Sequence, residues 1–215
     1  MMRVGKYCCM ALLMMACQPR FLPAQQAPSK PAETAAAPAE SDEDKANELS
    51  EQVGKLMVKC VNLLTAEDPQ SLDYCKQQRD LADQYPPHQR LVDKMMAHDE
   101  YGIALAAFDH KEEALQEFDR EIVLVPQAVK PGSPEWSTAY WHRAMIYTQL
   151  GQIDKADHDF RSAEENFRKA SAGSDSESAE KKRRIILRQH AALLEKEGKT
   201  EAAHQLLQEA AKQNP

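Results

Sequence analysis

Residues 140–160, YWHRAMIYTQLGQIDKADHDF, decide the fold of this chain. Spacings of three, four, five and four residues separate Ala144, Tyr147, Gly151, Ala156 and Phe160. Side chains three or four residues apart share one face of a helix, and glycine commonly ends a helix. The stretch therefore predicts two helices that meet at a glycine turn, with small residues where the helices touch.

The same register recurs in two other stretches. The spacing from Ala156 to Phe160 is repeated in 114–118, ALQEF, and with Leu as the last residue in 203–207, AHQLL. Twelve residues before each alanine stands a small residue, and three residues after that stands a large one. The small residues are Gly102, Ala144 and Ala191, and the large ones are Leu105, Tyr147 and Leu194. A register shared by three stretches predicts three copies of one helical hairpin.

These copies resemble the tetratricopeptide repeat (TPR), a helix-turn-helix unit of about 34 residues. The family pattern is W-x2-L-G-x2-Y in the first helix and A-x3-F followed by P in the second. Here it is carried by His98, Tyr101, Gly102, Leu105, Ala114, Phe118 and Pro126, by Tyr140, Ala144, Tyr147, Ala156, Phe160 and Ala163, and by Leu187, Ala191, Leu194, Ala203, Leu207, Ala210 and Pro215. The sequence departs from the pattern at Arg143 and His190, which replace Leu, and at Glu121, which replaces a small residue.

The resemblance implies an all-α fold in which TPR hairpins stack into a right-handed α-solenoid. One hairpin cannot cover its own apolar stripe, so stacked hairpins share a continuous core. We expect three TPR units within 95–215, at about 95–128, 137–170 and 184–215, after a helical hairpin in 41–94 that is either a divergent repeat or a separate element. The residues expected to fill the seams between units are Phe118, Phe160 and Leu207.

The first helices of TPR domains line a concave groove that binds protein segments. The predicted partner-binding residues that this resemblance assigns are Met96, Ile103, Trp141, His142, Met145 and Arg188. Trp141 is the best anchor because Trp is enriched in binding hot spots, and the alternative is that it fills a seam between units. Asp99 and Glu100 on the same face argue against the basic clamp that some family members use, and favour a segment with basic and apolar residues.

The first residues are typical of a secretory signal. Arg3 and Lys6 precede an apolar run at 7–16, which is shorter than the roughly 20 residues that span a bilayer. The end of the run, LLMMAC, resembles a bacterial lipoprotein signal, although Met14 and Met15 stand where Leu and a small residue are usual.

The lipoprotein resemblance implies a signal peptide at 1–16 and lipidation of Cys17. Cleavage without lipid and an uncleaved anchor are the alternatives. Gln18, in place of Asp, points to the outer membrane, so we expect a periplasmic protein anchored there by Cys17, or a soluble exported one. The Pro- and Ala-rich segment 17–40 is expected to be a tether, because such a composition buries too little apolar surface to fold.

Two cysteines, Cys60 and Cys75, lie beyond this region. Apolar spacing predicts a helix over 46–64, and Asp68 followed by Pro69 predicts the start of a second helix that reaches Tyr85. The two cysteines are equally distant from the connecting turn, so we predict a disulfide that stabilises the hairpin by roughly 3 kcal/mol. Two buried free thiols are the alternative, and a metal site would need further ligands that are not evident.

Composition bounds the function. Hydrophobic residues are 42%, aromatic residues 6%, and glycines only 7 in number, which favours helices over strands. A net charge of -7 argues against nucleic-acid binding, and we expect KKRR at 181–184 to be a solvated helix start or, alternatively, a contact with a partner or lipid headgroups.

No phosphate loop, nucleophile elbow or zinc-protease motif is present, so we expect no enzyme activity, catalytic residue, cofactor or metal. The sequence instead predicts a tethered periplasmic scaffold that binds a protein partner in an envelope complex. A holdase-like chaperone for unfolded exported segments is the alternative, followed by a purely structural role in an oligomer.

Overall fold

Helical hairpins make up the part of the chain that the computed structural model describes, residues 41–171 and 177–212. The helices in this part are α1 (Asp42–Thr65), α2 (Ser71–Ala82), α3 (Leu91–Ala107), α4 (Lys111–Ala128), α5 (Pro134–Gln149), α6 (Ile153–Ser171), α7 (Glu177–Lys196) and α8 (Thr200–Ala211). The expected signal peptide, tether and lipidated Cys17 lie outside the described residues, as does Pro215. None of the described helices has the length and apolar character needed to cross a bilayer.

The turns inside the hairpins follow from local residue chemistry. Gly151 ends α5 with φ 69°, in the left-handed region where a side chain is strained. Asp109 takes the equivalent place after α3 with φ 68°, and Asp is one of the few residues with a side chain that tolerates this region. The turn between α5 and α6 is therefore the glycine turn that the sequence predicts, and the turn after α3 is closed without glycine.

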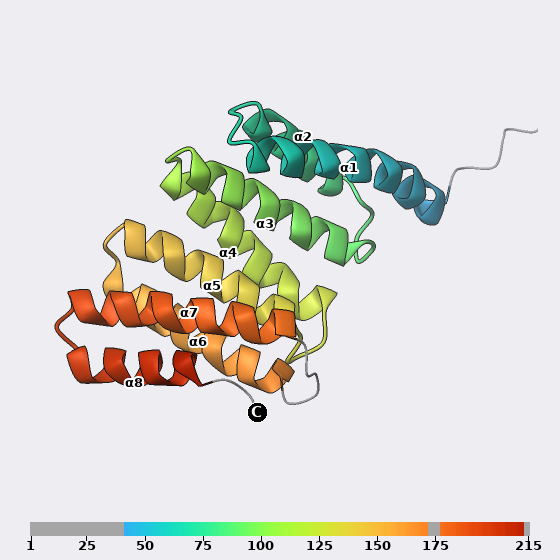
Figure 1. Ribbon diagram of the computed structural model, residues 1–215. Helices are drawn as coiled ribbons and strands as arrows, with labels where there is room; N and C mark the ends of the chain where they lie inside the picture. Colours follow the sequence, from blue (N-terminus) through green and yellow to red (C-terminus); the bar gives the residue numbers. More distant parts are fainter. Residues whose placement is uncertain (1–40, 172–176, 213–215) are drawn as a thin grey trace, which may run out of the picture. The chain divides into compact units, whose positions relative to one another are not determined.

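The helices pack in pairs, and each pair packs on the next. α1 packs on α2, α3 on α4, α5 on α6 and α7 on α8, while α2–α3, α4–α5 and α6–α7 join consecutive pairs (Figure 1). Contacts also link α1 to α3, α3 to α5 and α5 to α7, whereas the described second helices do not contact one another. The stack therefore curves toward its first helices, and the solvent-facing side of α1, α3, α5 and α7 is called the inner face below.

Small residues inside each hairpin and large residues between hairpins build the core. Ala114, Ala156 and Ala203 are fully buried where the two helices of a hairpin touch. Phe118 packs in a cluster that includes Ile146 of the next hairpin, and Phe160 packs with Ile186 and Leu193.

Leu207 does not fill a seam, and this prediction was wrong. The side chain is 38% exposed, whereas Phe118 and Phe160, at the equivalent positions, are each 1% exposed. No described helix follows α8, so Leu207 has no next hairpin to pack against.

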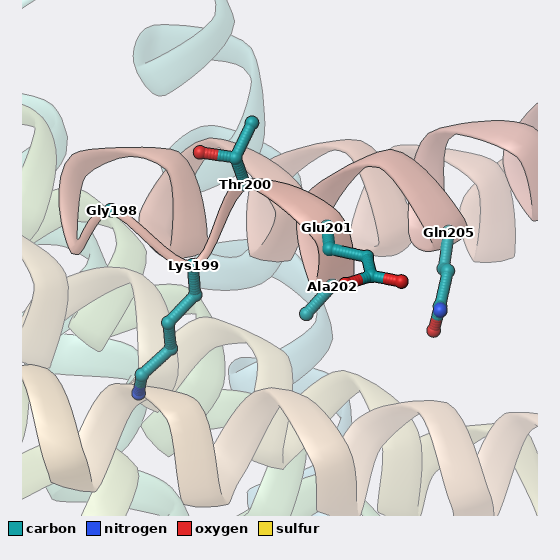
Figure 2. Close-up of a pocket in the computed structure, with 6 residues that line it drawn as sticks. All are labelled: Gly198, Lys199, Thr200, Glu201, Ala202 and Gln205. Atoms are coloured by element: carbon teal, nitrogen blue, oxygen red, sulfur yellow. The ribbon is translucent and has the colours of Figure 1, made fainter.

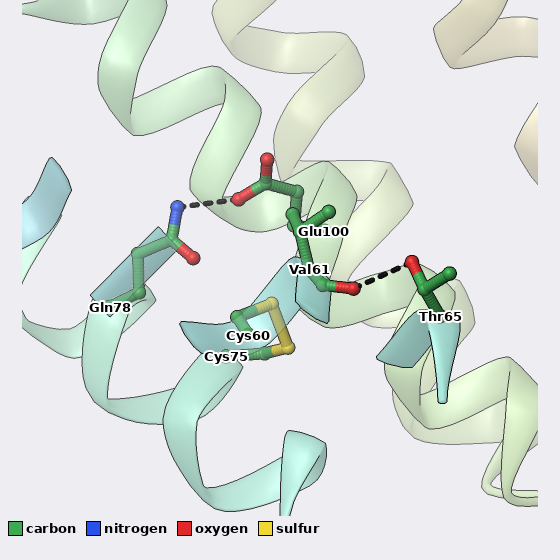
Figure 3. Close-up of a disulfide and its surroundings, with 6 residues drawn as sticks. All are labelled: Cys60, Val61, Thr65, Cys75, Gln78 and Glu100. Carbon is green, nitrogen blue, oxygen red and sulfur yellow. Dashed lines mark hydrogen bonds between the residues drawn. A yellow bond between two sulfur atoms is a disulfide. The ribbon is translucent and has the colours of Figure 1, made fainter. Parts of the chain in front are cut away.

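The first hairpin differs in detail from the prediction. α2 begins at Ser71, shortly after Asp68 and Pro69 as predicted, and the Asp68 carboxylate accepts the Gln70 N–H at 2.9 Å as a capping residue does. Tyr85 lies beyond the end of α2 and is buried. A disulfide joins Cys60 to Cys75 with a Cα–Cα distance of 4.8 Å, and both residues are fully buried (Figure 3).

Helix α7 begins before the basic run, which was expected at a helix start. Residues 181–184 lie inside α7, whose first residue is Glu177. Lys181 and Lys182 are exposed, but Arg183 is half-buried and forms ion pairs with Glu180 and Glu209. Part of this run therefore joins α7 to α8 instead of facing solvent.

Candidate functional site

The predicted partner-binding residues lie on α3, α5 and α7. Met96 is 40% exposed, and Arg188 is also exposed. Ile103, Trp141, His142 and Met145 are half-buried. Ile103 packs against the core cluster around Phe118, while Trp141 and Met145 pack against the cluster around Phe160. These side chains therefore belong partly to the surface and partly to the core.

Two hydrogen bonds at equivalent positions join consecutive first helices on the inner face. Asp99 Oδ1 of α3 lies 2.5 Å from His142 Nδ1 of α5. Trp141 Nε1 of α5 donates to Gln189 Oε1 of α7, also at 2.5 Å. Asp99 and Trp141 each stand three residues before the small residue of their helix, and His142 and Gln189 each stand two before it.

This repeated link places several predicted residues. Met96 is three residues before Asp99, and Met145 is four residues after Trp141, so both share the helix side that faces the next first helix. The indole N–H of Trp141 is already satisfied by Gln189, so a partner would meet mainly the apolar ring. Trp141 thus combines the two roles considered for it, a bridge between units and a surface side chain.

The α3 part of the inner face is acidic. Glu100 accepts a hydrogen bond from Gln78 of α2 at 2.6 Å (Figure 3), and burial raises the pKa of Glu100 to about 6. Glu121 of α4 is 2% exposed, and its Oε2 has no hydrogen-bond partner among the described residues. Burial, together with the nearby Asp99 charge, raises the pKa of Glu121 well above its usual range. The equivalent residues of the other hairpins are Ala82, Ala163 and Ala210.

Sequence reasoning missed two apolar residues of α1, Val58 and Val61, which are 55% and 41% exposed. The interval from Cys60 to Gly102 equals the interval from Gly102 to Ala144, and Cys60 is buried in α1 as those two residues are in α3 and α5. Val61, directly after Cys60, therefore corresponds in position to Ile103 and Met145. That equal interval is the signal that would have extended the predicted surface to α1.

The departures from the TPR pattern carry buried charge instead of apolar packing. The Arg143 guanidinium donates to Asp159 at 2.6 and 3.0 Å and to Asp119 at 2.8 Å. Burial opposes the charge of Arg143, but the hydrogen bonds that it donates to Asp159 and Asp119 outweigh burial and raise its pKa. His190 is held between Asp157 and Glu164 of α6. His190 thus contacts the preceding hairpin, and Arg143 contacts the preceding hairpin through Asp119 and its own hairpin through Asp159.

The described residues offer little for chemistry. They contain no group of three or more His, Cys, Asp or Glu side chains placed to hold a metal ion. Figure 2 shows a surface hollow of about 530 Å³ lined by Gly198, Lys199, Thr200, Glu201, Ala202 and Gln205. Because these residues all come from one turn and the start of α8, no second element forms an opposite wall.

Comparison with known proteins identifies the fold. No family model and no curated protein sequence matches the chain. The TPR-like repeats of a kinesin light chain from Podosopora anserina match with a TM-score of 0.60 and 14% identity, over 74% of this chain and 73% of that one. BtubC (BKLC) from P. vanneervenii matches with a TM-score of 0.53 and 12% identity, over 80% and 72% of the two chains. The predicted fold, an all-α right-handed α-solenoid of TPR hairpins, is confirmed.

Proposed function

We propose that this protein is a membrane-tethered periplasmic scaffold, anchored to the outer membrane through lipidated Cys17. Its inner face binds a protein partner during assembly of an envelope complex. The TPR-like fold supports a role in protein–protein interaction, and the signal-like sequence at 1–17 is the basis for the location. The Cys60–Cys75 disulfide is compatible with an exported protein, because disulfides persist in oxidising compartments.

One observation carries the binding role: apolar side chains recur at one register on three consecutive first helices. Val61 on α1, Ile103 on α3 and Met145 on α5 each follow the buried residue of their helix. Asp99 and Glu100 add acidic groups beside them on α3. The matching partner is a segment that presents apolar residues together with basic ones, because these satisfy both kinds of group.

Site-specific photo-cross-linking in the native cell tests the binding face. A photoreactive residue at Met96 or Met145 probes the inner face, and one at Val123 of α4, which is 64% exposed, is the matched control. We expect one discrete adduct with an envelope protein from the two inner-face positions and none from Val123. Equal adducts from Val123, or none from Met96 and Met145, would overturn the assignment.

The same experiment separates the scaffold from the chaperone. A scaffold gives one adduct of defined mass, because it selects one partner. A holdase gives many adducts of different mass, because it shields unfolded chains without selecting one. That second pattern would replace the scaffold by the chaperone.

Intact mass spectrometry of the protein from its membrane fraction tests the tether. We expect the mass of residues 17–215 plus lipid, increasing by one pair of hydrogen atoms when the disulfide is reduced. An unlipidated chain of full length with free thiols would contradict the envelope location and leave the binding face to be tested separately.

A further inference from the structure

A basic side chain, buried in two cases and half-buried in the third, marks each place where one hairpin packs on the next. These three places, α2 with α3, α4 with α5 and α6 with α7, are called junctions here. The basic residues are His98 on α3, Arg143 on α5 and His190 on α7, each on the first helix of the later hairpin. The two outer junctions thus use histidine, and the middle one uses arginine.

His98 connects the first junction. It is 3% exposed, and its Nδ1 lies 2.6 Å from Glu117 Oε2 of α4, while its Nε2 lies 3.3 Å from Asp83 Oδ1 at the end of α2. Both ring nitrogens therefore face a carboxylate, one from its own hairpin and one from the preceding hairpin. The charged side chains around these two carboxylates are Arg79 and Asp80 of α2, Lys94 of α3 and Arg120 of α4.

His190 connects the last junction in the same way. It is 2% exposed, with Nε2 at 2.7 Å from Asp157 Oδ1 and Nδ1 at 2.6 Å from Glu164 Oε1. Both carboxylates belong to α6 of the preceding hairpin, and the ring also stacks on Phe160 at a centroid distance of 5.2 Å. The further charge beside this site is Arg161, which pairs with Asp157 at 3.1 Å.

The geometry at both histidines favours the charged ring. An ionised carboxylate only accepts hydrogen bonds, and a neutral imidazole has one donor and one lone pair. A neutral ring would turn its lone pair toward a carboxylate oxygen, whereas the imidazolium donates to both. Burial alone would lower the pKa of each histidine, but the hydrogen bonds that the ring donates to its two carboxylates outweigh burial and raise the pKa.

The middle junction does not depend on such a proton. Arg143 stays charged throughout the accessible pH range. His142 also crosses this junction, but only its Nδ1 faces a carboxylate, that of Asp99, and the neutral Nδ1–H tautomer can still donate that hydrogen bond. Glu121 lies beside Asp99, and its Oε2 has no hydrogen-bond partner in the described part of the chain.

We propose that the two outer junctions respond to pH. Protonated His98 holds the hairpin α1–α2 on α3–α4, and protonated His190 holds the hairpin α7–α8 on α5–α6. Loss of these protons loosens both end hairpins. The histidine contribution to stability is complete below the unfolded pKa of about 6.5 and is lost as pH rises through the raised folded pKa. The window for this response therefore lies above about pH 6.5.

Other groups shape the background without hiding the response. Glu100 and Glu121 also have raised pKa values, so their contribution to stability falls as pH rises from about 4.5, for Glu100 through about 6. Asp83 and Asp157 have lowered pKa values, and their contribution is lost only in acid. Comparing each histidine variant with wild type at the same pH removes the background of Glu100 and Glu121, and the two aspartates change only in acid, outside the tested window.

Hydrogen exchange resolved by segment tests the proposal on the full chain. In wild type we expect the protection of α1–α2 and α7–α8, corrected for intrinsic exchange, to fall between pH 6 and 9. The fall should be about tenfold for each unit by which the histidine pKa in the folded protein exceeds that in the unfolded chain. His98→Gln should remove this dependence only in α1–α2, and His190→Gln only in α7–α8. His204→Gln, at an exposed position of α8, is the matched control and should change neither end.

Two further measurements keep the test decisive if a glutamine variant does not fold. His190→Arg supplies a permanent cation, as Arg143 does at the equivalent position, and should keep α7–α8 protected at pH 9. Histidine side-chain NMR on the wild-type protein should show two rings that titrate above about 6.5. Titration of both rings at or below that value, or an unchanged pH response in both glutamine variants, would overturn the proposal.

Discussion

The first and last hairpins each end the described stack, but they are stabilised in different ways. The first hairpin has a 24-residue helix α1, a capping box at Ser41 and the Cys60–Cys75 disulfide. The last hairpin has a 12-residue helix α8, whose N-cap Lys199 makes no side-chain capping hydrogen bond. It relies on buried Ala203 and on the Arg183–Glu209 ion pair instead.

This contrast shows that residues at the same repeat position in different hairpins do not contribute equally to stability. In a stack, stability is the sum of each hairpin's own contacts and its contacts with neighbours. Phe160 and Leu207 share one position, yet only Phe160 lies between two hairpins. The first hairpin has a covalent link between its two helices, and the last hairpin has none in its described residues.

The largest expected effect separates the middle of the stack from its last hairpin. Phe160→Ala should lower the free energy of unfolding by about 3–5 kcal/mol, because it empties a fully buried seam. Leu207→Ala should cost less than about 0.5 kcal/mol, as expected for an exposed side chain. Urea denaturation followed by circular dichroism measures both, and similar losses would show that Leu207 is covered in solution.

The disulfide tests the first hairpin. Cys60→Ala combined with Cys75→Ala should cost about 3 kcal/mol in that hairpin, because the unfolded chain regains the freedom of a closed loop. Hydrogen exchange should then increase in α1 and α2 and stay unchanged in α7 and α8. Wild type under reducing conditions should behave like the double variant. Equal exchange in the oxidised and reduced proteins would remove the contrast between the two ends.

Contacts inside a hairpin should not depend on its place in the stack. Ala156 and Ala203 are both fully buried between the two helices of their own hairpins. Leucine at either position should cost about 1–3 kcal/mol through overpacking, and the two losses should be similar. The measurement is the thermal midpoint of each variant. A much smaller loss for Ala203→Leu would indicate that the last hairpin opens to accommodate the larger side chain.

The smallest expected effect concerns the start of α1. Ser41 Oγ accepts the Asp44 N–H at 3.1 Å, and Asp44 Oδ2 accepts the Ser41 N–H at 3.3 Å. Ser41→Ala should destabilise α1 by about 1 kcal/mol and increase exchange in its first turn. Lys199→Ala at the start of α8 is the control and should have little effect, because no cap is lost.

The repeat made the fold predictable from particular residues. Gly151 and the spacing from Ala156 to Phe160 predict two helices, the turn between them and a buried contact. These features depend on local sequence. The prediction that Leu207 fills a seam was wrong because burial at that position needs a following hairpin, which the spacing does not reveal. The predicted extension of α2 to Tyr85 was wrong, because the Tyr85 N–H donates to the Ala82 carbonyl at 3.2 Å in a tighter turn before Pro86.

The site was less predictable because its groups meet only after folding. The sequence marks Arg143 and His190 as unusual, but their acidic partners lie on neighbouring helices at positions that the repeat pattern leaves variable. Glu121 is unusual in the same way, and only the packing shows that its carboxyl is buried beside Asp99. The predicted binding face of α3 and α5 followed from the register of the repeat. The exposed Val58 was missed because that register was not extended to α1.

The placement of the two tryptophans has a practical consequence for optical experiments. Trp136 and Trp141 both lie on α5, where Trp136 packs against Met95 and Val125, and Trp141 donates to Gln189. Fluorescence of the two tryptophans therefore reports on the middle of the stack and not on α1, α2 or α8. If the ends unfold first, the fluorescence midpoint should exceed the midpoint from circular dichroism, and the gap between the two spectroscopic midpoints would measure how far the end hairpins act independently.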